Sequence, residues 1–258
     1  MIVGLIGCGN IGREIALFLQ RSSFFHLKYI HDIVPTDSFI NELRLLGKIQ
    51  VAKIQAVGFD ELVEKSELII EAASKEAVNL LFQKNLDNKK VMILSTGGLL
   101  GKEFRHLNII IPSGAVAGID ALKAVAGQID MIRLVTTKSP QSLQGAPYVL
   151  EKNIDLYSIK EKKTIFSGLL AAAIQGFPRN VNVAATISLA VNKDITVEVV
   201  VDPNIKTNTH NILCSGSFGT MNLLVENKPS KNPKTSQLAV LSAIQTLRNI
   251  ESSARIGT

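Results

Sequence analysis

The glycine-rich segment near the start of the chain has the spacing of a phosphate-binding turn. Gly7-Cys8-Gly9-Asn10-Ile11-Gly12 follows an apolar run at residues 2–6 and precedes an amphipathic stretch. Between a strand and a helix, Gly7 permits a tight turn, Gly9 lets a pyrophosphate approach the backbone, and Gly12 lets the helix pack close to the strand. The N–H groups at the start of that helix would face the phosphates. The sequence therefore predicts a dinucleotide site formed by Gly7, Gly9, Asn10, Ile11 and Gly12.

An acidic residue stands where such a site would bind a ribose. Residues 27–31 form a second strand-like run, and Asp32 follows it, about twenty residues after the last glycine of the turn. A carboxylate at this point accepts hydrogen bonds from ribose hydroxyls, and its charge repels a 2′-phosphate. We therefore predict NAD rather than NADP as the cofactor. The alternatives are a glycine-rich turn without a ligand and a solvated loop acid.

Polar side chains in the second half of the chain are candidates for proton transfer. Asn208 and His210 are two residues apart in a β-type segment, so their side chains share one face of a strand. A histidine can accept a proton while a hydride leaves for a cofactor, and Asn208 can donate hydrogen bonds to a carboxylate. An ordinary surface histidine is the alternative, and spacing alone favours that interpretation.

Three cationic side chains are candidate partners for an anionic substrate. Arg179 lies in the segment Phe177-Pro178-Arg179-Asn180, Lys138 precedes Ser139-Pro140, and Lys234 lies close to the C-terminal helical segment. A guanidinium group can bind a carboxylate through two parallel hydrogen bonds. For each of the three, an exposed charge without a ligand is the alternative.

The elements that must position these groups change in character along the chain. In the first part, apolar strand-like runs alternate with helical patterns, which predicts a doubly wound parallel sheet of the Rossmann type that ends near Ile111. Small residues follow the predicted strands at Ser74, 95–98 and 112–115, where a nicotinamide ring would approach the backbone. We interpret residues 35–48 as a polar connection.

The remaining chain predicts an α+β second domain. Its closely spaced β-type segments indicate an antiparallel or mixed sheet, and two short buried helices are expected to cover one face. The last segment is an amphipathic helix that we expect to pack on the first domain. The predicted domains are residues 1–111, 112–235 and 236–258. The β-type segments are residues 131–137, 195–202, 208–215 and 220–226, and the helices are residues 168–174, 180–191 and 236–251.

The composition argues against several classes of protein. The chain has 258 residues, of which 46% are hydrophobic, so it can bury a substantial core. Glycine, proline and polar residues interrupt the most apolar stretch, at residues 164–192, which argues against a membrane span, and the N-terminus lacks the features of a signal peptide. Cys8 and Cys214 form neither metal-ligand spacing nor a disulfide framework. We therefore expect a cytoplasmic protein without a bound metal.

The charge distribution gives little support to nucleic-acid binding. The net charge is +6, but the basic residues are scattered, and the aromatic residues, only 5% of the chain, are not interleaved with them. A basic surface would also attract an anionic cofactor and substrate. We therefore expect a small-molecule partner and no nucleic acid.

At these segments the chain resembles the L-aspartate dehydrogenase family, and the resemblance spans nearly the whole length. Many dehydrogenases share the glycine turn, whereas four later segments, in their order, are much more specific. These segments are residues 112–120 (PSGAVAGID), residues 177–187 (FPRNVNVAATI), Asp202-Pro203 with Asn208 and His210, and residues 229–236 (PSKNPKTS).

The resemblance implies oxidation of L-aspartate to iminoaspartate with hydride transfer to NAD(P), a reaction that supplies NAD biosynthesis. It implies that His210 is the active-site histidine and that Ala115 and Asn180 contact the cofactor. Members of the family often accept both NAD and NADP, and the family suggests a homodimer. We expect His210 to act as the general base. The candidates for binding the two substrate carboxylates are Asn208, Lys138 and Arg179.

Two other functions remain open at this point. One is a related reductase or dehydrogenase of another amino acid or imine, such as homoserine dehydrogenase or dihydrodipicolinate reductase, which share the pattern of the first domain. The other is a non-catalytic module that binds NAD and reports the redox state to a partner. The polar group at Asn208 and His210 argues against the module, because a sensor needs no proton-transfer group.

Overall fold

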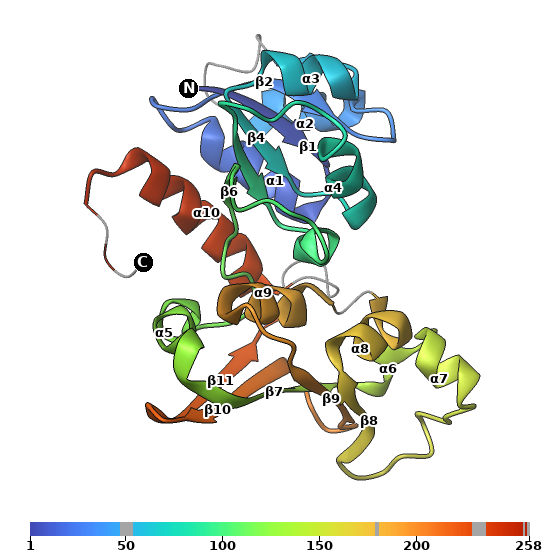
Figure 1. Ribbon diagram of the computed structural model, residues 1–258. Helices are drawn as coiled ribbons and strands as arrows, with labels where there is room; N and C mark the ends of the chain where they lie inside the picture. The colour runs from blue at the N-terminus through green and yellow to red at the C-terminus, as the bar shows by residue number, and fades with distance from the viewer. Residues whose placement is uncertain (47–53, 179–180, 229–235, 255, 257–258) are drawn as a thin grey trace. The chain divides into compact units, whose positions relative to one another are not determined.

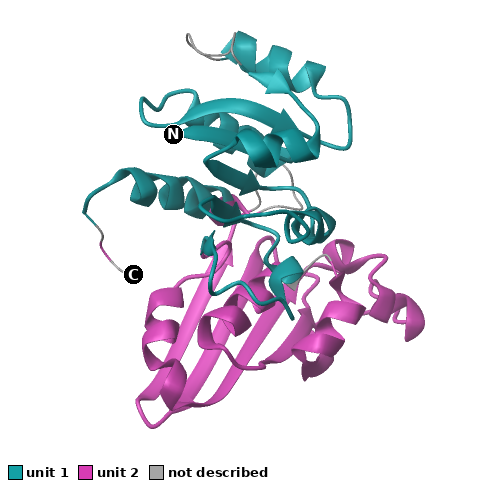
Figure 2. Cartoon of the chain, turned by 45° about the horizontal axis from the view of Figure 1, so that its top comes forward, with its two compact units in different colours: residues 1–112, 240–255 teal, residues 113–239, 256–258 magenta. Residues whose placement is uncertain are grey.

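The chain is divided into two compact units. The computed structural model describes residues 1–46, 54–178, 181–228, 236–254 and 256. Unit 1 comprises residues 1–112 and 240–255, and unit 2 comprises residues 113–239 and 256–258 (Figure 2). Among the described residues, no helix combines the length and the apolar character that a membrane crossing requires.

Unit 1 is built on a six-stranded sheet in which all neighbouring strands are parallel (Figure 1). The strand order is β3-β2-β1-β4-β5-β6, so the direction of winding reverses between β1 and β4. The predicted doubly wound parallel sheet is confirmed. The strands are β1 (Ile2–Ile6), β2 (His26–His31), β3 (Gln55–Ala56), β4 (Leu68–Glu71), β5 (Lys90–Ile93) and β6 (Asn108–Ile110).

The helices of unit 1 correct one prediction. The segment at residues 35–48, interpreted as a polar connection, contains helix α2 (Asp37–Leu46). Its buried side chains Phe39, Ile40 and Leu43 recur at helical spacing, but the polar residues between them hide that period. The other helices before residue 112 are α1 (Asn10–Leu19), α3 (Phe59–Lys65), α4 (Lys75–Leu81) and the short 3₁₀ helix η2 (Thr96–Leu99).

The core of unit 1 includes residues from both ends of the chain. Val3 and Leu5 of β1 are fully buried, and so are Ala243 and Leu247 of the C-terminal helix α10 (Gln237–Glu251). All four belong to one cluster of buried apolar side chains. The apolar face of α10 is therefore part of the hydrophobic core that forms around the parallel sheet.

Unit 2 is built on a five-stranded mixed sheet with the order β11-β10-β7-β9-β8. Strands β7 and β9 are parallel, and the other neighbouring pairs are antiparallel. The predicted antiparallel or mixed sheet is confirmed. The strands are β7 (Ile129–Lys138), β8 (Lys163–Leu169), β9 (Thr196–Val201), β10 (Asn208–Gly216) and β11 (Gly219–Asn227).

Strand β8 was not predicted, and it shifts a predicted helix toward the C-terminus. We expected a helix from residue 168, but β8 continues to Leu169 and helix α8 covers Leu170–Gly176. Pairing with β9 extends through Leu169, so tertiary contacts override local helix preference here. The other helical elements of this unit are α5 (Ile119–Val125), η3 (Ala126–Gln128), α6 (Pro140–Leu143), α7 (Pro147–Glu151) and α9 (Val181–Val191).

The two faces of the mixed sheet differ in their cover. Figure 1 shows α5, α8 and α9 on the same side of the sheet. On that side lie Thr136 and His210, which are paired in register on β7 and β10. Lys138 and Asn208 share this face, because each is two residues from one of them along its strand. We call it the covered face, and we call the opposite face, with Val135, Asn211 and their neighbours, the open face.

Candidate functional site

The glycine turn of unit 1 leaves room for a ligand above one of its residues. Gly7 has φ +97°, and a Cβ there would lie 2.6 Å from the carbonyl oxygen of Ala72. A Cβ on Gly12 would overlap the carbonyl oxygen of Gly7, whereas a Cβ on Gly9 would meet nothing within 4 Å. Two glycines are therefore required by the fold, and the third leaves open space at the first turn of α1.

Asp32 is held against the same turn by backbone hydrogen bonds. Its Oδ2 accepts a hydrogen bond from the N–H of Cys8 at 2.6 Å, and its Oδ1 accepts one from the N–H of Val34 at 3.2 Å. A carboxylate oxygen has two acceptor sites, so each oxygen can accept a further bond from a hydroxyl. The remaining acceptor sites of Asp32 suit ribose hydroxyls, and the space at Gly9 suits a pyrophosphate. Together they fit a dinucleotide.

Cys8 is not a reactive group of this turn. Burial, together with the negative charge of Asp32, raises the pKa of its thiol to about 12. The thiol therefore stays protonated at neutral pH, and only a thiolate is a good nucleophile. Cys8 is instead partly buried and packs against the apolar core of unit 1.

A buried carboxylate at the end of β4 was missed by the sequence analysis. Glu71 is fully buried. Its Oε1 accepts hydrogen bonds from the N–H of Ala73 and the Oγ of Ser95, both at 2.8 Å, and its Oε2 accepts one from the N–H of Ser95 at 2.9 Å. Burial raises its pKa, and these bonds act in the opposite direction. An acid at the end of the run Leu68-Ile69-Ile70 was the available signal, because buried strands rarely end on a charge.

His210 is a buried imidazole on β10. Its Nδ1 forms a hydrogen bond of 3.0 Å with the Oγ1 of Thr136 on the neighbouring strand β7. Burial, and to a smaller extent the charge of Lys138, lowers its pKa to about 3. The imidazole is therefore neutral at physiological pH. It is not the ordinary surface histidine that spacing alone suggested, since only 6% of its surface is exposed.

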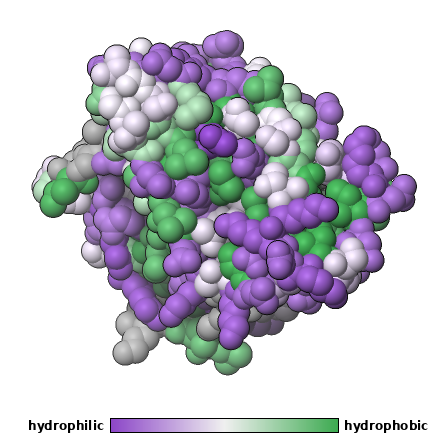
Figure 3. Space-filling model, turned by 90° about the horizontal axis from the view of Figure 1, so that it is seen from below, coloured by the Kyte–Doolittle hydropathy of each residue, from purple (hydrophilic) through white to green (hydrophobic). Residues whose placement is uncertain are grey.

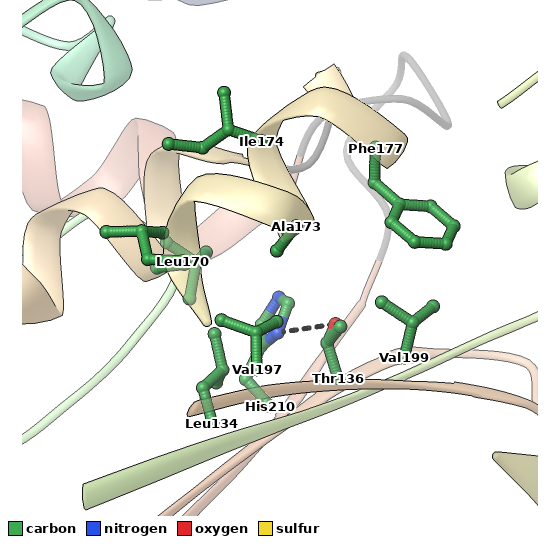
Figure 4. A pocket seen from close by; sticks show the side chains of 11 residues that line it. Leu134, Thr136, Leu170, Ala173, Ile174, Phe177, Val197, Val199 and His210 are labelled. Atoms are coloured by element: carbon green, nitrogen blue, oxygen red, sulfur yellow. Dashed lines mark hydrogen bonds between the residues drawn. The ribbon is translucent and has the colours of Figure 1, made fainter. Parts of the chain in front are cut away.

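The pocket around His210 is almost entirely apolar. The sheet contributes Leu134, Val197 and Val199, and the rest of the wall comes from α8, α9 and Phe177. Figure 4 shows the imidazole of His210 standing on the sheet beneath α8, with Thr136 beside it. Apolar walls contain no hydrogen-bond donors or positive charges that could bind a carboxylate. Their effect is to exclude water from the imidazole, which disfavours its charged form.

Two of the predicted substrate-binding residues lie close to His210. Lys138 is buried, and desolvation lowers its pKa to about 8. Since Thr137 pairs with Thr209 in the antiparallel ladder, Lys138 lies beside Asn208 on the covered face. Asn208 is partly exposed. The structure therefore brings together a neutral base, a desolvated cation and an amide, which suit a substrate that carries both an amine and a carboxylate.

Ala115 is held by a residue that the sequence analysis did not identify. The Nδ2 of Asn227, at the end of β11, donates a hydrogen bond of 2.8 Å to the carbonyl oxygen of Ala115. Its Oδ1 accepts a bond of 2.7 Å from the Oγ of Ser236, just before α10. Asn227 thus ties the end of β11 both to the start of α10, nine residues later, and to Ala115, 112 residues earlier. The other predicted site residues of this region, Arg179, Asn180 and Lys234, lie outside the described residues.

The chain is similar in sequence and in fold to known proteins. The family model described as "Aspartate dehydrogenase, C-terminal" matches residues 120–250. The chain is similar to an L-aspartate dehydrogenase of Methanocella arvoryzae, at 40% identity over 99% of each chain, and to one of Nitrosopumilus maritimus, at 37% identity over 95% of each. A crystal structure of aspartate dehydrogenase from Thermotoga maritima superposes with a TM-score of 0.72 at 29% identity, covering 100% of this chain and 99% of that one.

The two kinds of glycine in the turn should respond differently to alanine. Gly9→Ala should leave the melting temperature unchanged and weaken nucleotide binding about tenfold or more, because the new methyl group occupies the space left for the ligand. Gly12→Ala should lower the free energy of unfolding by about 1–3 kcal/mol, because its methyl group overlaps the backbone of Gly7. Thermal unfolding and isothermal titration with NAD measure both effects. Normal nucleotide affinity in Gly9→Ala would contradict the assignment of this turn.

The low pKa of His210 should make stability depend on pH. Between the ordinary histidine pKa near 6.5 and the folded value of about 3, the unfolded chain binds a proton that the folded chain does not, so stability falls as the pH decreases through this range. Lowering the pH from 7.5 to 5 should cost the wild type about 2 kcal/mol more than it costs His210→Asn. Urea unfolding at the two pH values measures this difference.

The exposed His26 provides the control for that measurement. His26→Asn should keep the pH dependence of the wild type, since the imidazole it removes is not buried. Equal pH dependence in the wild type and in His210→Asn would show that the imidazole of His210 is not held neutral.

Proposed function

The chain belongs to the aspartate dehydrogenase family, and we propose that it oxidises L-aspartate to iminoaspartate with hydride transfer to a pyridine nucleotide. The observation that carries this proposal within the chain is the buried, neutral His210 next to Lys138. Such a pair provides a proton acceptor and an anion-binding group for one amino-acid substrate.

We assign the nucleotide-binding role to unit 1. The residues that would hold the pyrophosphate are Gly7, Gly9, Asn10, Ile11 and Gly12, at the start of α1. Asp32 would accept hydrogen bonds from the ribose hydroxyls, and its charge favours NAD over NADP. The support for this role is the open space at Gly9 and the position of Asp32 over the turn. When bound, the nucleotide accepts the hydride from Cα of the substrate.

We assign the general-base role to His210. Its Nδ1–H donates to the Oγ1 of Thr136 in the tautomer that leaves Nε2 free to accept a proton. Nε2 takes one proton from the substrate ammonium group, and the nitrogen lone pair then forms the C=N bond as the Cα hydrogen leaves as hydride. The product is iminoaspartate, and the proton remains on the imidazole.

The low pKa of His210 in the free protein is compatible with this role. Part of the lowering comes from the charge of Lys138. A substrate carboxylate beside Lys138 would offset that charge and add a negative charge near the imidazole, and both effects raise the pKa of His210. The base therefore becomes stronger when the substrate is bound.

We propose Lys138 and Asn208 as partners of the substrate carboxylates. Lys138 is desolvated and has no anionic partner among the described ion pairs, so an incoming carboxylate would stabilise its charge. Asn208 lies beside it and can donate from its amide nitrogen. From the sequence, Arg179 remains a third candidate, and Ala115 and Asn180 remain candidates for contact with the cofactor.

We also propose that the chain forms a homodimer through the open face of the mixed sheet. This face carries apolar side chains, among them Leu224, which is 59% exposed. Two buried polar atoms on it, Thr209 Oγ1 and Asn211 Oδ1, have no hydrogen-bond partner among the described residues. Figure 3, seen from below, shows apolar patches between polar side chains. A two-fold contact with a second copy would cover the apolar area and could satisfy these atoms.

Replacement of His210 tests the proposed reaction. His210→Ala should reduce kcat for aspartate-dependent reduction of NAD by about a hundredfold or more, because the proton acceptor is lost. Nucleotide affinity should not change, because His210 is not among the residues assigned to nucleotide binding. Steady-state assays with L-aspartate, D-aspartate, glutamate and homoserine, each with NAD and with NADP, measure activity and selectivity together.

The same assays show how the proposal could fail. A kcat close to the wild-type value in His210→Ala would reject the general-base role. Faster turnover of homoserine or glutamate than of L-aspartate by the wild type would reject the substrate, and a preference for NADP would reject the role given to Asp32.

A single charge on the open face tests the dimer. Leu224→Glu should convert the dimer to a monomer, since it places a carboxylate in a contact that is proposed to be apolar. Leu150→Glu is the matched control, because Leu150 on α7 is 64% exposed and does not belong to this face. Light scattering coupled to size-exclusion chromatography measures the mass. A monomeric wild type, or a dimeric Leu224→Glu, would contradict the proposed interface.

A further inference from the structure

Glu71 lies at the edge of the parallel sheet where ligands bind. It is the last residue of β4 and is paired in register with Ile6 of β1, the residue before Gly7. The winding of the sheet reverses between these two strands, and open parallel sheets bind ligands beyond the carboxyl ends of the strands at such a point. The Cα of Glu71 therefore lies about one strand spacing, roughly 5 Å, from that of Ile6, and Ser95, which follows β5, holds the carboxylate at this edge of the sheet.

The hydrogen bonds of Glu71 favour its ionised form. The N–H groups of Ala73 and Ser95 can only donate, and each donates to a different carboxylate oxygen. The hydroxyl of Ser95 adds a third bond. Within the described residues, no lysine, arginine or histidine forms an ion pair with Glu71. Burial raises the pKa of Glu71, and these three hydrogen bonds oppose that rise. In its ionised form the carboxylate is therefore stabilised by dipoles alone and is not neutralised by a cation.

Such a charge acts differently on the two redox forms of a pyridine nucleotide. The oxidised nicotinamide ring carries a positive charge and the reduced ring is neutral, while the rest of the molecule is the same. A buried charge is weakly screened by water and salt, so it attracts the oxidised ring and has little effect on the reduced one. Asp32 is partly exposed, and at the ribose it would influence both forms alike.

We propose that Glu71 is a specificity-determining residue, whose buried carboxylate favours binding of the oxidised over the reduced nucleotide. The proposal rests on the nucleotide-binding role assigned to unit 1. It adds a function for the β4 carboxylate that is separate from substrate chemistry in unit 2. By favouring the oxidised form, Glu71 promotes loading of the nucleotide that can accept a hydride and release of the reduced one.

The ratio of two dissociation constants tests this proposal. Glu71→Gln removes the charge and nearly preserves the shape of the side chain. The ratio Kd(NAD⁺)/Kd(NADH), measured by isothermal titration without substrate, should rise about five- to tenfold in this variant. Ser95→Ala removes one hydrogen bond and Glu71→Asp shortens the side chain, but both keep the charge. In these two controls the ratio should stay within about twofold of the wild type, even if both dissociation constants increase.

The outcomes separate this inference from the proposed function. If the wild type binds neither nucleotide, the nucleotide-binding role fails and this inference fails with it. If the wild type binds both and Glu71→Gln weakens them equally, Glu71 is only structural and the inference alone is overturned. If Glu71→Gln does not fold, Glu71→Met removes the same charge, and an unchanged ratio in that variant overturns the inference. A shift of about fivefold or more in Ser95→Ala or Glu71→Asp would assign the ratio to geometry rather than to charge.

Discussion

The antiparallel register between β7 and β10 is the constraint on which the proposed catalytic site depends. It pairs Thr136 with His210, residues 74 positions apart in the chain. A shift of one residue would move His210 to the open face and expose its imidazole to water. The hydrogen bond to Thr136, the apolar surroundings and the neighbouring Lys138 all follow from this single register. The low pKa of the imidazole is therefore a consequence of strand pairing.

Close packing of the backbone shapes the proposed nucleotide site of unit 1. Gly7 lies against the strand end at Ala72, and Gly12 lies against Gly7. These contacts leave no space for side chains where the turn meets the sheet, but they leave space above Gly9. The buried Glu71 then holds the turns after β4 and β5 through backbone N–H groups. The site is thus built mainly from carbonyl, amide and carboxylate groups held in place by the sheet.

Local signals in the sequence were sufficient for part of this structure. The glycine turn and Asp32 could be predicted because their roles depend on residues close in the chain. The closeness of Lys138, Asn208 and His210 could not, because it depends on a pairing between distant strands, although each residue had been proposed separately. Helix α2 was missed because polar residues mask its three buried side chains. Glu71 was missed because an isolated acid after a strand does not reveal its burial.

The division of α10 between the two units affects the order in which the chain can fold. Residues 1–112 lack part of their core until Ala243 and Leu247 have been added from the far end of the chain. Residues 113–239 are nearly complete within one continuous segment. During synthesis the second unit can therefore reach its final packing first, while the first remains open to chaperones and proteases until α10 has left the ribosome. Loss of the last helix would harm the oldest part of the nascent chain most.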